Sequence, residues 1–352
     1  MARNCPDCPD VGLSPLVVMF CALIGILVVI LLIFWKESKE SGVSDTVDVM
    51  LVGCGLPGRG MGWYHARNML DGLCPAAKLT DVVEPWFLGG GKSGPAGEEF
   101  AAFATAESKN GVRFHASLDD VPPATGKRLC LIAGRTGDNP RLLKEVIAKG
   151  CTHIYLEKPG APTVGELEDM KAYAKAKGVE VYMGYNKNVT KYVQQARDFE
   201  ASNPGAVTTF THNNAYKESE LPECFERNAE GMLKNMVIHE CALLVTYYGV
   251  TAETIASVKA DKAYSKLMTI KGPGGKTFTD FAKVGFTITT TAGTTVSVKG
   301  DRCGGNNSLA DVSVNGSDVF QSITPDAALS QRVEKEQKAH PDWMPYFLSQ
   351  HD

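Results

Sequence analysis

Short apolar runs alternate with amphipathic stretches along the first half of the chain. Five of these runs have the length and β-branched content of buried strands: residues 47–52, 78–83, 127–132, 153–156 and 179–183. In the stretches between them, such as residues 139–150 and 163–178, apolar side chains recur at helical spacing. This alternation predicts an α/β fold with a mostly parallel sheet and right-handed crossovers.

The pattern changes in the second half of the chain. Residues 206–216 and 284–300 alternate Thr, Val, Ile and Phe in the manner of antiparallel strands, and TAGTT at residues 291–295 fits a hairpin turn. We therefore expect a C-terminal α/β domain built on an open, mostly antiparallel sheet.

One apolar segment is too long for a strand. Residues 16–35 contain no charged side chain, and about 20 such residues cross the hydrocarbon core of a bilayer. A secretory signal fits less well, because its apolar region is about 7 to 15 residues long and ends in small residues, whereas this segment runs into FWK. A buried core helix is a third alternative. We predict a single N-terminal transmembrane helix at residues 16–35, between a tail at residues 1–15 and a linker at residues 36–46.

Composition narrows the class of protein. A chain of 352 residues with 44% hydrophobic and 22% charged residues is typical of about two globular domains. The net charge of -4, with no basic run interleaved with aromatic residues, argues against nucleic-acid binding. Cys5 and Cys8 have C-x-x-C spacing, but no second pair completes a zinc site, so no metal is predicted.

Cysteine usage bears on localisation. Seven of the ten cysteines lie after the linker, an odd number that cannot all pair, and several belong to apolar runs where thiols behave as small buried hydrophobes. This favours a reducing compartment and predicts a single-pass membrane protein with a cytosolic body. The sequons at Asn188, Asn306 and Asn315 leave a lumenal orientation open.

A glycine turn follows the first apolar run. Gly53, Gly55 and Gly58 satisfy G-x-G-x-x-G, in which backbone approaches a phosphate at the start of a helix. The second run ends at Glu84, where a carboxylate accepts both ribose hydroxyls of NAD and repels the 2′-phosphate of NADP. A solvated acid at a strand end is the simpler alternative for Glu84, and Lys92 nearby leaves NADP open. The pattern predicts a Rossmann dinucleotide-binding domain that prefers NAD.

A lysine closes the fourth run, in THIYLEKPGAPT at residues 152–163. Pro159 ends the strand and restricts Lys158 to extended geometry. Ligands of parallel sheets bind at the carboxyl ends of the strands. The glycine turn, Glu84, Lys158 and Asn186 are therefore expected on one edge, with the lysine directed at a dinucleotide.

These residues resemble the glucose-fructose oxidoreductase / inositol dehydrogenase (Gfo/Idh/MocA) family over about residues 47–250. The matching elements are GCG followed by GWYHA, then VVEP, YLEKPGAPT and MGYN. In that family the lysine lies beside nicotinamide and substrate, and a later helix supplies an Asp-x-x-x-His pair. Asn235 and His239 hold those places here, four residues apart and so on one helix face. Without the resemblance, a satisfied core histidine is the simpler interpretation of His239.

Three departures from the family pattern concern the site. If Gly62 and His65 hold the places of the third glycine and its trailing histidine, LPGR is an insertion that brings Arg59 toward a phosphate. In the loop AGRTGDN, Arg135 replaces a proline and Asn139 a histidine, which changes the contact with the cofactor. An asparagine at position 235 hydrogen-bonds a hydroxyl but carries no charge to raise the pKa of a neighbour.

The resemblance implies an NAD(P)-dependent oxidoreductase that transfers hydride between nicotinamide and a sugar, cyclitol or related hydroxy/keto compound. Its implied catalytic residues are His239 for proton transfer, Lys158 for acid/base work or substrate orientation, and Asn235 for hydrogen-bonding the substrate. The implied cofactor-binding residues are Gly53, Gly55, Gly58, Gly62, Glu84, Arg135, Glu157, Lys158 and Asn186.

The resemblance also divides the chain after the linker. Residues 47–187 are the expected Rossmann domain and residues 188–352 the expected substrate domain, whose sheet in the family often mediates homo-oligomers. A second hypothesis, a non-catalytic dinucleotide sensor or scaffold of the same fold, rests on Asn235 and the altered AGRTGDN loop.

Overall fold

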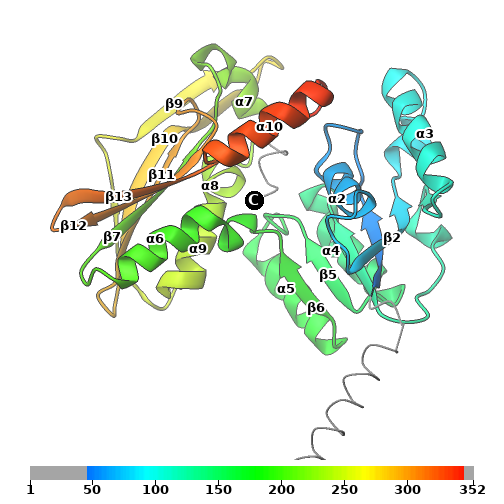
Figure 1. Ribbon diagram of the computed structural model, residues 1–352, viewed down its shortest axis with the longest axis horizontal. Coiled ribbons are helices and arrows are strands. Elements are labelled where there is room, and N and C mark those ends of the chain that lie inside the picture. The colour runs from blue at the N-terminus through cyan, green and yellow to red at the C-terminus, as the bar shows by residue number, and fades with distance from the viewer. Residues whose placement is uncertain (1–45, 345–352) are drawn as a thin grey trace, which may run out of the picture. The chain divides into compact units, whose positions relative to one another are not determined.

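The structure is a computed structural model that describes residues 46–344 (Figure 1). Its first sheet has six strands in the order β3-β2-β1-β4-β5-β6, and all neighbouring pairs are parallel. The strands are β1 (Val47–Val52), β2 (Ala77–Val83), β3 (Arg113–His115), β4 (Arg128–Ile132), β5 (His153–Leu156) and β6 (Glu180–Met183). This is the order of a doubly wound dinucleotide-binding sheet, so the predicted parallel Rossmann-like sheet is confirmed.

Helices connect the parallel strands. They are α2 (Met61–Leu70), α3 (Pro95–Ser108), α4 (Asn139–Ala148) and α5 (Val164–Ala176). Helix α4 shows why they form: Leu142, Leu143 and Val146 recur at helical spacing and are buried against the sheet. A 3₁₀ turn, η4 (Asn186–Val189), follows β6 and leads to α6 (Lys191–Ala201).

The second sheet has seven strands in the order β13-β12-β7-β11-β10-β8, with β9 paired to β10. They are β7 (Val207–Asn213), β8 (Ile255–Ala260), β9 (Lys266–Lys271), β10 (Thr277–Thr290), β11 (Thr295–Asp301), β12 (Ser308–Val314) and β13 (Ser317–Thr324). Only the pairing of β7 with β11 is parallel. The second sheet is thus mixed and mostly antiparallel, as predicted.

Helices pack on one face of the second sheet. They include α6, α8 (Met232–Asn235) and α9 (Ile238–Tyr248), while α7 (Leu221–Arg227) packs against β9 and β10, and α10 (Ala327–Ala339) follows β13. Tyr192, Phe210 and Leu243 belong to the core between this face and its helices. Residues 47–344 belong to one compact unit, so the domain boundary expected at residue 187, which falls within η4, stays a prediction. So does the homo-oligomer.

The predicted membrane localisation requires correction. No helix within residues 46–344 is long and apolar enough to cross a membrane. The longest of these helices, α3, has 14 residues, whereas a span requires about 20 apolar residues. The segment 16–35, with its flanking tail and linker, lies outside the described residues. On this finding, the prediction of a single-pass membrane protein with a cytosolic body is wrong.

Candidate active site

The carboxyl ends of the parallel strands lie at one edge of the first sheet. The strand register pairs Val52 with both Val83 and Ile132, then Ile132 with Leu156, and Leu156 with Met183. The loops that follow these strand ends therefore leave the sheet side by side. They contain the predicted cofactor residues Gly53, Gly55, Gly58, Glu84, Arg135, Glu157, Lys158 and Asn186.

The glycine turn has two distinct parts. Gly53 and Gly55 have φ of 83° and 74°, which side-chain-bearing residues rarely adopt. A Cβ on Gly62 would lie 2.1 Å from the carbonyl oxygen of Gly53, so this glycine lets α2 pack against β1. Gly58 lies in the turn before the helix, with φ of 70°. Gly62 therefore has the packing role of a third glycine, and LPGR forms an extra turn.

Replacing Gly62 by alanine is expected to lower the free energy of unfolding by about 3 kcal/mol, because the new Cβ overpacks the contact with β1. Gly165, in the first turn of α5, is the matched control: a Cβ there meets no atom within 4 Å. Its replacement by alanine should be neutral or stabilise by about 0.5–1 kcal/mol. Urea unfolding of both variants tests this prediction. Equal stability of the two variants would contradict the packing role of Gly62.

Glu84 is tied to the glycine turn. Its side chain is buried, and its two carboxylate oxygens accept hydrogen bonds from the backbone N–H groups of Gly55 (2.8 Å) and Trp86 (3.1 Å). A carboxylate oxygen can accept more than one hydrogen bond. Glu84 can therefore support the turn and still accept from a ribose hydroxyl, so it is not merely a solvated acid at a strand end.

The edge has the features that a dinucleotide needs. Helix α2 begins after Gly60, which provides no side-chain cap for its first N–H groups. A helix start of this kind favours phosphate. The Oδ1 atom of Asn186 is buried and has no partner within residues 46–344. A bound group with a hydrogen-bond donor would satisfy it.

Of the predicted cofactor residues, Glu157 is hydrogen-bonded to other side chains and Arg135 is exposed. Glu157 Oε1 lies 2.8 Å from His65 Nε2 and accepts a hydrogen bond from the Tyr155 hydroxyl at 3.2 Å, which links β5 to α2. Arg135 is exposed in the loop after β4. Asn139 is buried, and its amide donates to the carbonyl of Gly160 at 2.9 Å. That amide thus supports the loop around Lys158.

Lys158 links the sheet edge to the second half of the chain. Its ammonium donates to the backbone carbonyl of Asn235 at 2.8 Å. Burial lowers the pKa of Lys158, while the charges of Glu157 and Glu230 oppose that shift. An ammonium group has three N–H donors, so two remain for a substrate. The sequence led us to expect the Asn235 side chain as the neighbour, whereas its carbonyl is the group that holds the lysine.

A polar cavity of about 600 Å³ brings the three predicted catalytic residues together. Lys158, Asn235 and His239 all line it. The rest of its wall is formed by His212, Asn214, Ala215, Tyr216, Glu220, Asn228, Met236, Asn306 and Met344. Most of these side chains carry hydroxyl, amide or imidazole groups, so the cavity suits a ligand with several hydroxyls.

Behind this cavity lies a buried ionic network that the sequence did not reveal. Glu240 is fully buried and lies 2.5 Å from the ammonium of Lys187, which also donates to Ser308 Oγ at 2.7 Å. His212 Nδ1 lies 3.2 Å from the other carboxylate oxygen of Glu240. The sequence feature that could have indicated this network is Glu240, an acidic residue within the largely apolar helix α9.

The network sets the charge states around the cavity. Burial by itself would raise the pKa of Glu240, but Lys187 and His212 outweigh it and bring that pKa to about 2. Burial lowers the pKa of both His212 and His239, and the positive charge of Lys187 adds to this effect. Both histidines are therefore neutral at neutral pH, and each can accept a proton.

The chain's C-terminal region also reaches the site. The Met344 N–H donates to the Tyr64 hydroxyl at 2.8 Å, and this hydroxyl donates to the carbonyl of Gly58, also at 2.8 Å. The Trp343 ring packs edge-to-face on Trp63, with centroids 5.2 Å apart. This region thus contacts the extra turn of the glycine loop.

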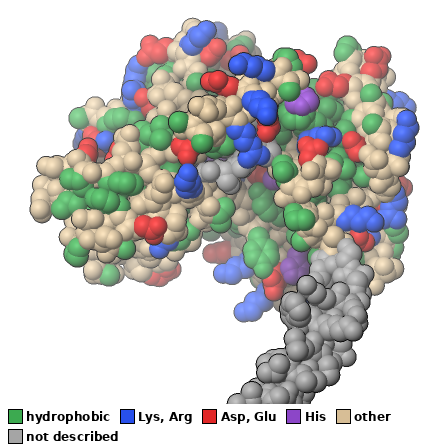
Figure 2. Space-filling view, in the orientation of Figure 1, with side chains coloured by type: hydrophobic (Ala, Val, Ile, Leu, Met, Phe, Trp, Pro, Cys, Tyr) green, Lys and Arg blue, Asp and Glu red, His purple; other side chains and the backbone are tan. Residues whose placement is uncertain are grey.

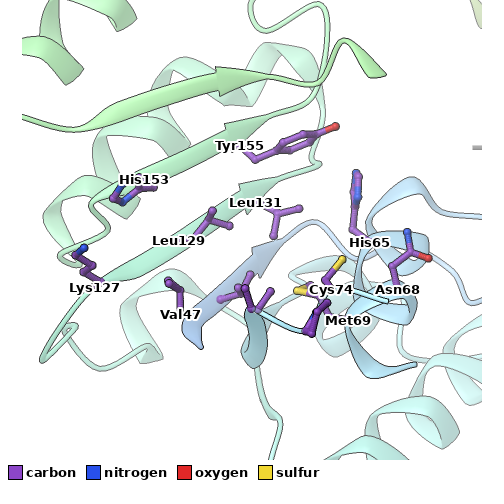
Figure 3. Close-up of a pocket in the computed structure, with 14 residues that line it drawn as sticks. Val47, His65, Asn68, Met69, Cys74, Lys127, Leu129, Leu131, His153 and Tyr155 are labelled. Carbon is purple, nitrogen blue, oxygen red and sulfur yellow. The ribbon is translucent and has the colours of Figure 1, made fainter. Parts of the chain in front are cut away.

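A second cavity, of about 530 Å³, lies on a face of the first sheet (Figure 3). Figure 3 shows side chains from β1, β4 and β5 facing α2, among them Leu129, Leu131 and Tyr155. Its lining is mostly apolar and extends to the amino ends of the strands, so a charged dinucleotide does not suit it.

On the face of the molecule that Figure 2 shows, acidic and basic side chains are interspersed.

Comparison with known proteins gives one family match, over part of the chain. Residues 91–185 match the Gfo/Idh/MocA family model, described as an oxidoreductase family with an NAD-binding Rossmann fold. No curated protein matches the chain.

Several solved structures share the fold. Myo-inositol dehydrogenase from Corynebacterium glutamicum is 17% identical, with a TM-score of 0.57 over 80% of this chain and 77% of that one. Scyllo-inositol dehydrogenase from Lactobacillus casei, with NAD(H) and scyllo-inositol bound, is 14% identical, with a TM-score of 0.56 over 79% of this chain and 76% of that one. GenD2 from gentamicin A biosynthesis, in complex with NAD, is 18% identical, with a TM-score of 0.58 over 79% of this chain and 72% of that one. At these identities the likeness concerns the fold.

Residues 91–185 thus match the NAD-binding Rossmann domain of an oxidoreductase family, and the described residues share the fold of dehydrogenases solved with NAD bound. The predicted enzyme class and the predicted cofactor, NAD, are thereby confirmed. The individual site residues, the substrate and the oligomeric state stay predictions.

Proposed function

We propose that this protein is an NAD-dependent dehydrogenase that interconverts a hydroxyl and a keto group on a cyclitol or sugar-like polyol. The observation that carries the proposal is the polar cavity, in which Lys158 from the cofactor edge meets Asn235 and His239 from the second half of the chain.

The cavity wall supports a polyol substrate. Asn214, Asn228 and Asn306 offer amide donors and acceptors, and Tyr216 offers a hydroxyl. Such groups can pair with several hydroxyls of one ring, because each amide both donates and accepts. The structurally similar scyllo-inositol dehydrogenase was solved with scyllo-inositol bound. A cyclitol is therefore the first substrate class to test.

The first sheet's edge would hold the cofactor. NAD supplies the hydride acceptor when bound. The start of α2 would receive its pyrophosphate, and Glu84 its adenosine ribose hydroxyls. A carboxylate at Glu84 repels the 2′-phosphate of NADP, so NAD is the preferred form.

The cavity residues would move the proton. His239 and His212 are both neutral because burial lowers their pKa, so an imidazole of the cavity wall can accept the proton of a substrate hydroxyl. Lys158 would donate a hydrogen bond to the substrate oxygen while the Asn235 carbonyl holds its ammonium in place. The Asn235 side chain would hydrogen-bond a neighbouring hydroxyl.

The test is NADH formation by the full chain with NAD and a panel of cyclitols and sugars. We expect turnover of at least one cyclitol, and tighter binding of NADH than of NADPH in a fluorescence titration. Tight NADH binding without turnover of any compound would instead favour the sensor or scaffold hypothesis. NADPH binding as tight as that of NADH would contradict the role given to Glu84.

A further inference from the structure

The polar cavity contains a second histidine, His212, that belongs to none of the sequence motifs. It lies in the central strand β7, where the sheet register pairs it with Gly300 on one side and Ser308 on the other. Its ring and that of His239 both line the cavity, with centroids 6.1 Å apart. Its position on a central strand holds the His212 ring more rigidly than a loop would.

The hydrogen bonds of His212 determine which ring nitrogen carries the proton. Its Nδ1 lies 3.1 Å from the carbonyl oxygen of Met236 and 3.2 Å from a carboxylate oxygen of Glu240. Both partners are acceptors, so Nδ1 must be the donor. In the neutral ring, Nε2 then holds the lone pair. Within residues 46–344, Nε2 of His212 has no hydrogen-bond partner.

His239 lacks this support. Its Nδ1 is buried without a hydrogen-bond partner among the described residues, so neither tautomer is favoured by a contact. Its ring lies edge-on to Tyr185, with centroids 6.1 Å apart. No carboxylate within residues 46–344 is hydrogen-bonded to His239, whereas Glu240 is directly hydrogen-bonded to His212.

The location of the negative charge decides between the two histidines. Asn235 stands where the resembling family has an aspartate, so that position cannot stabilise an imidazolium. Glu240 supplies a buried carboxylate five positions later, and it is bonded to His212 and Lys187. A carboxylate behind a histidine holds its tautomer and stabilises the cation that forms when the ring accepts a proton.

We propose that His212 is the proton acceptor of the reaction and that Glu240, held by Lys187, is its positioning residue. This inference rests on the proposed dehydrogenase function. In the oxidation direction, the substrate O–H bond breaks as an Nε2–H bond forms on His212. The carbon that carries this hydroxyl gives up its hydride to NAD, and the carbinol becomes a carbonyl. His239 then contacts the substrate without taking its proton.

The kinetic test compares His212→Asn with His239→Asn in the full chain. Asparagine at position 212 keeps an amide near Nδ1 but has no base at Nε2. We expect kcat to fall by about 100-fold or more for His212→Asn, with the Kd for NADH within about threefold of wild type. For His239→Asn, kcat should fall by about tenfold or less. If kcat fell in His239→Asn and not in His212→Asn, the proposal would be overturned.

A spectroscopic test does not depend on turnover. In the full chain with ¹⁵N-labelled histidine, the signals of His212 are those lost in His212→Asn. We expect a protonated Nδ1 and an unprotonated Nε2, and Glu240→Gln should disturb this tautomer, because its amide nitrogen can donate. Addition of NADH and scyllo-inositol should shift the Nε2 resonance of His212. A ring protonated at Nε2 in the wild type would overturn the proposal.

The two tests separate this inference from the proposed function. Turnover by the wild type with full activity of His212→Asn would reject His212 and leave the dehydrogenase intact. If no cyclitol is turned over, the dehydrogenase proposal fails. The Nε2 resonance then decides whether His212 meets a hydroxyl of the ligand. A shift upon addition of scyllo-inositol supports His212 as the group that meets the substrate hydroxyl, and an unchanged resonance overturns it.

Discussion

Replacing Lys158 by methionine is expected to reduce kcat by about 100-fold or more and to leave the Kd for NADH within about threefold of wild type. The ammonium of Lys158 is held by the Asn235 carbonyl at 2.8 Å and lines the polar cavity, where two of its N–H groups face no partner among the described residues. Methionine keeps the length of the side chain but offers no donor to the substrate oxygen. Steady-state kinetics and a fluorescence titration measure the two quantities.

Lys234 provides the matched control for this prediction. It lies next to Asn235 in α8, and its ammonium also donates to a backbone carbonyl, that of Pro162, at 3.2 Å. It is exposed and does not line the cavity. Lys234→Met should therefore keep kcat within about threefold of wild type. If Lys158→Met and Lys234→Met behaved alike, Lys158 would have no part in the chemistry.

Replacing Lys187 by methionine is expected to lower the free energy of unfolding by about 3–5 kcal/mol, because it leaves the buried Glu240 carboxylate without its ammonium partner. The side chain of Lys187 is 9% exposed and that of Glu240 is 0% exposed, and their charged atoms lie 2.5 Å apart. Urea unfolding measures this loss. Adding Glu240→Gln to the variant should recover much of the stability, since a neutral amide costs less to bury than a carboxylate.

An exposed ion pair of the same kind serves as the control. Lys191 and Asp326 are 3.1 Å apart, but their side chains are 60% and 36% exposed. Solvent screens such a pair, so Lys191→Met should cost about 1 kcal/mol or less. A loss for Lys187→Met no greater than that for Lys191→Met would mean that Glu240 does not depend on Lys187 for its charge.

The part of the site that could be predicted from sequence is local. Each strand of the first sheet ends in a recognisable residue, so the parallel arrangement alone brings Gly53, Glu84 and Lys158 to one edge. The spacing of Asn235 and His239 predicted that they share one helix face, and this was wrong: Asn235 is the last residue of α8 and His239 lies in α9, although both line the cavity. Only the sheet edge follows from short stretches of chain and one rule of sheet structure.

The network behind the cavity could not be predicted in this way. Its members come from η4, β7, α9 and β12, and its hydrogen-bonded pairs are 28 to 121 residues apart in sequence. No spacing pattern links Lys187 to Glu240 or to His212, and each alone is typical of a surface turn, a strand or a helix start. Nor does the sequence indicate that the backbone carbonyl of Asn235, and not its side chain, holds Lys158.

The amino-acid sequence by itself determined the class of this protein, because alternating strands and helices, a glycine turn and a lysine at a strand end define an NAD-binding sheet without reference to distant contacts. The tertiary structure alone decided where the buried negative charge lies. Position 235, where the Asp-x-x-x-His motif has a carboxylate, is an uncharged asparagine. The packing of α9 against β7 and η4 instead places the Glu240 carboxylate beside His212 and Lys187. A buried carboxylate is stable only where the fold brings charged partners to it, and the sequence does not state which partners those are.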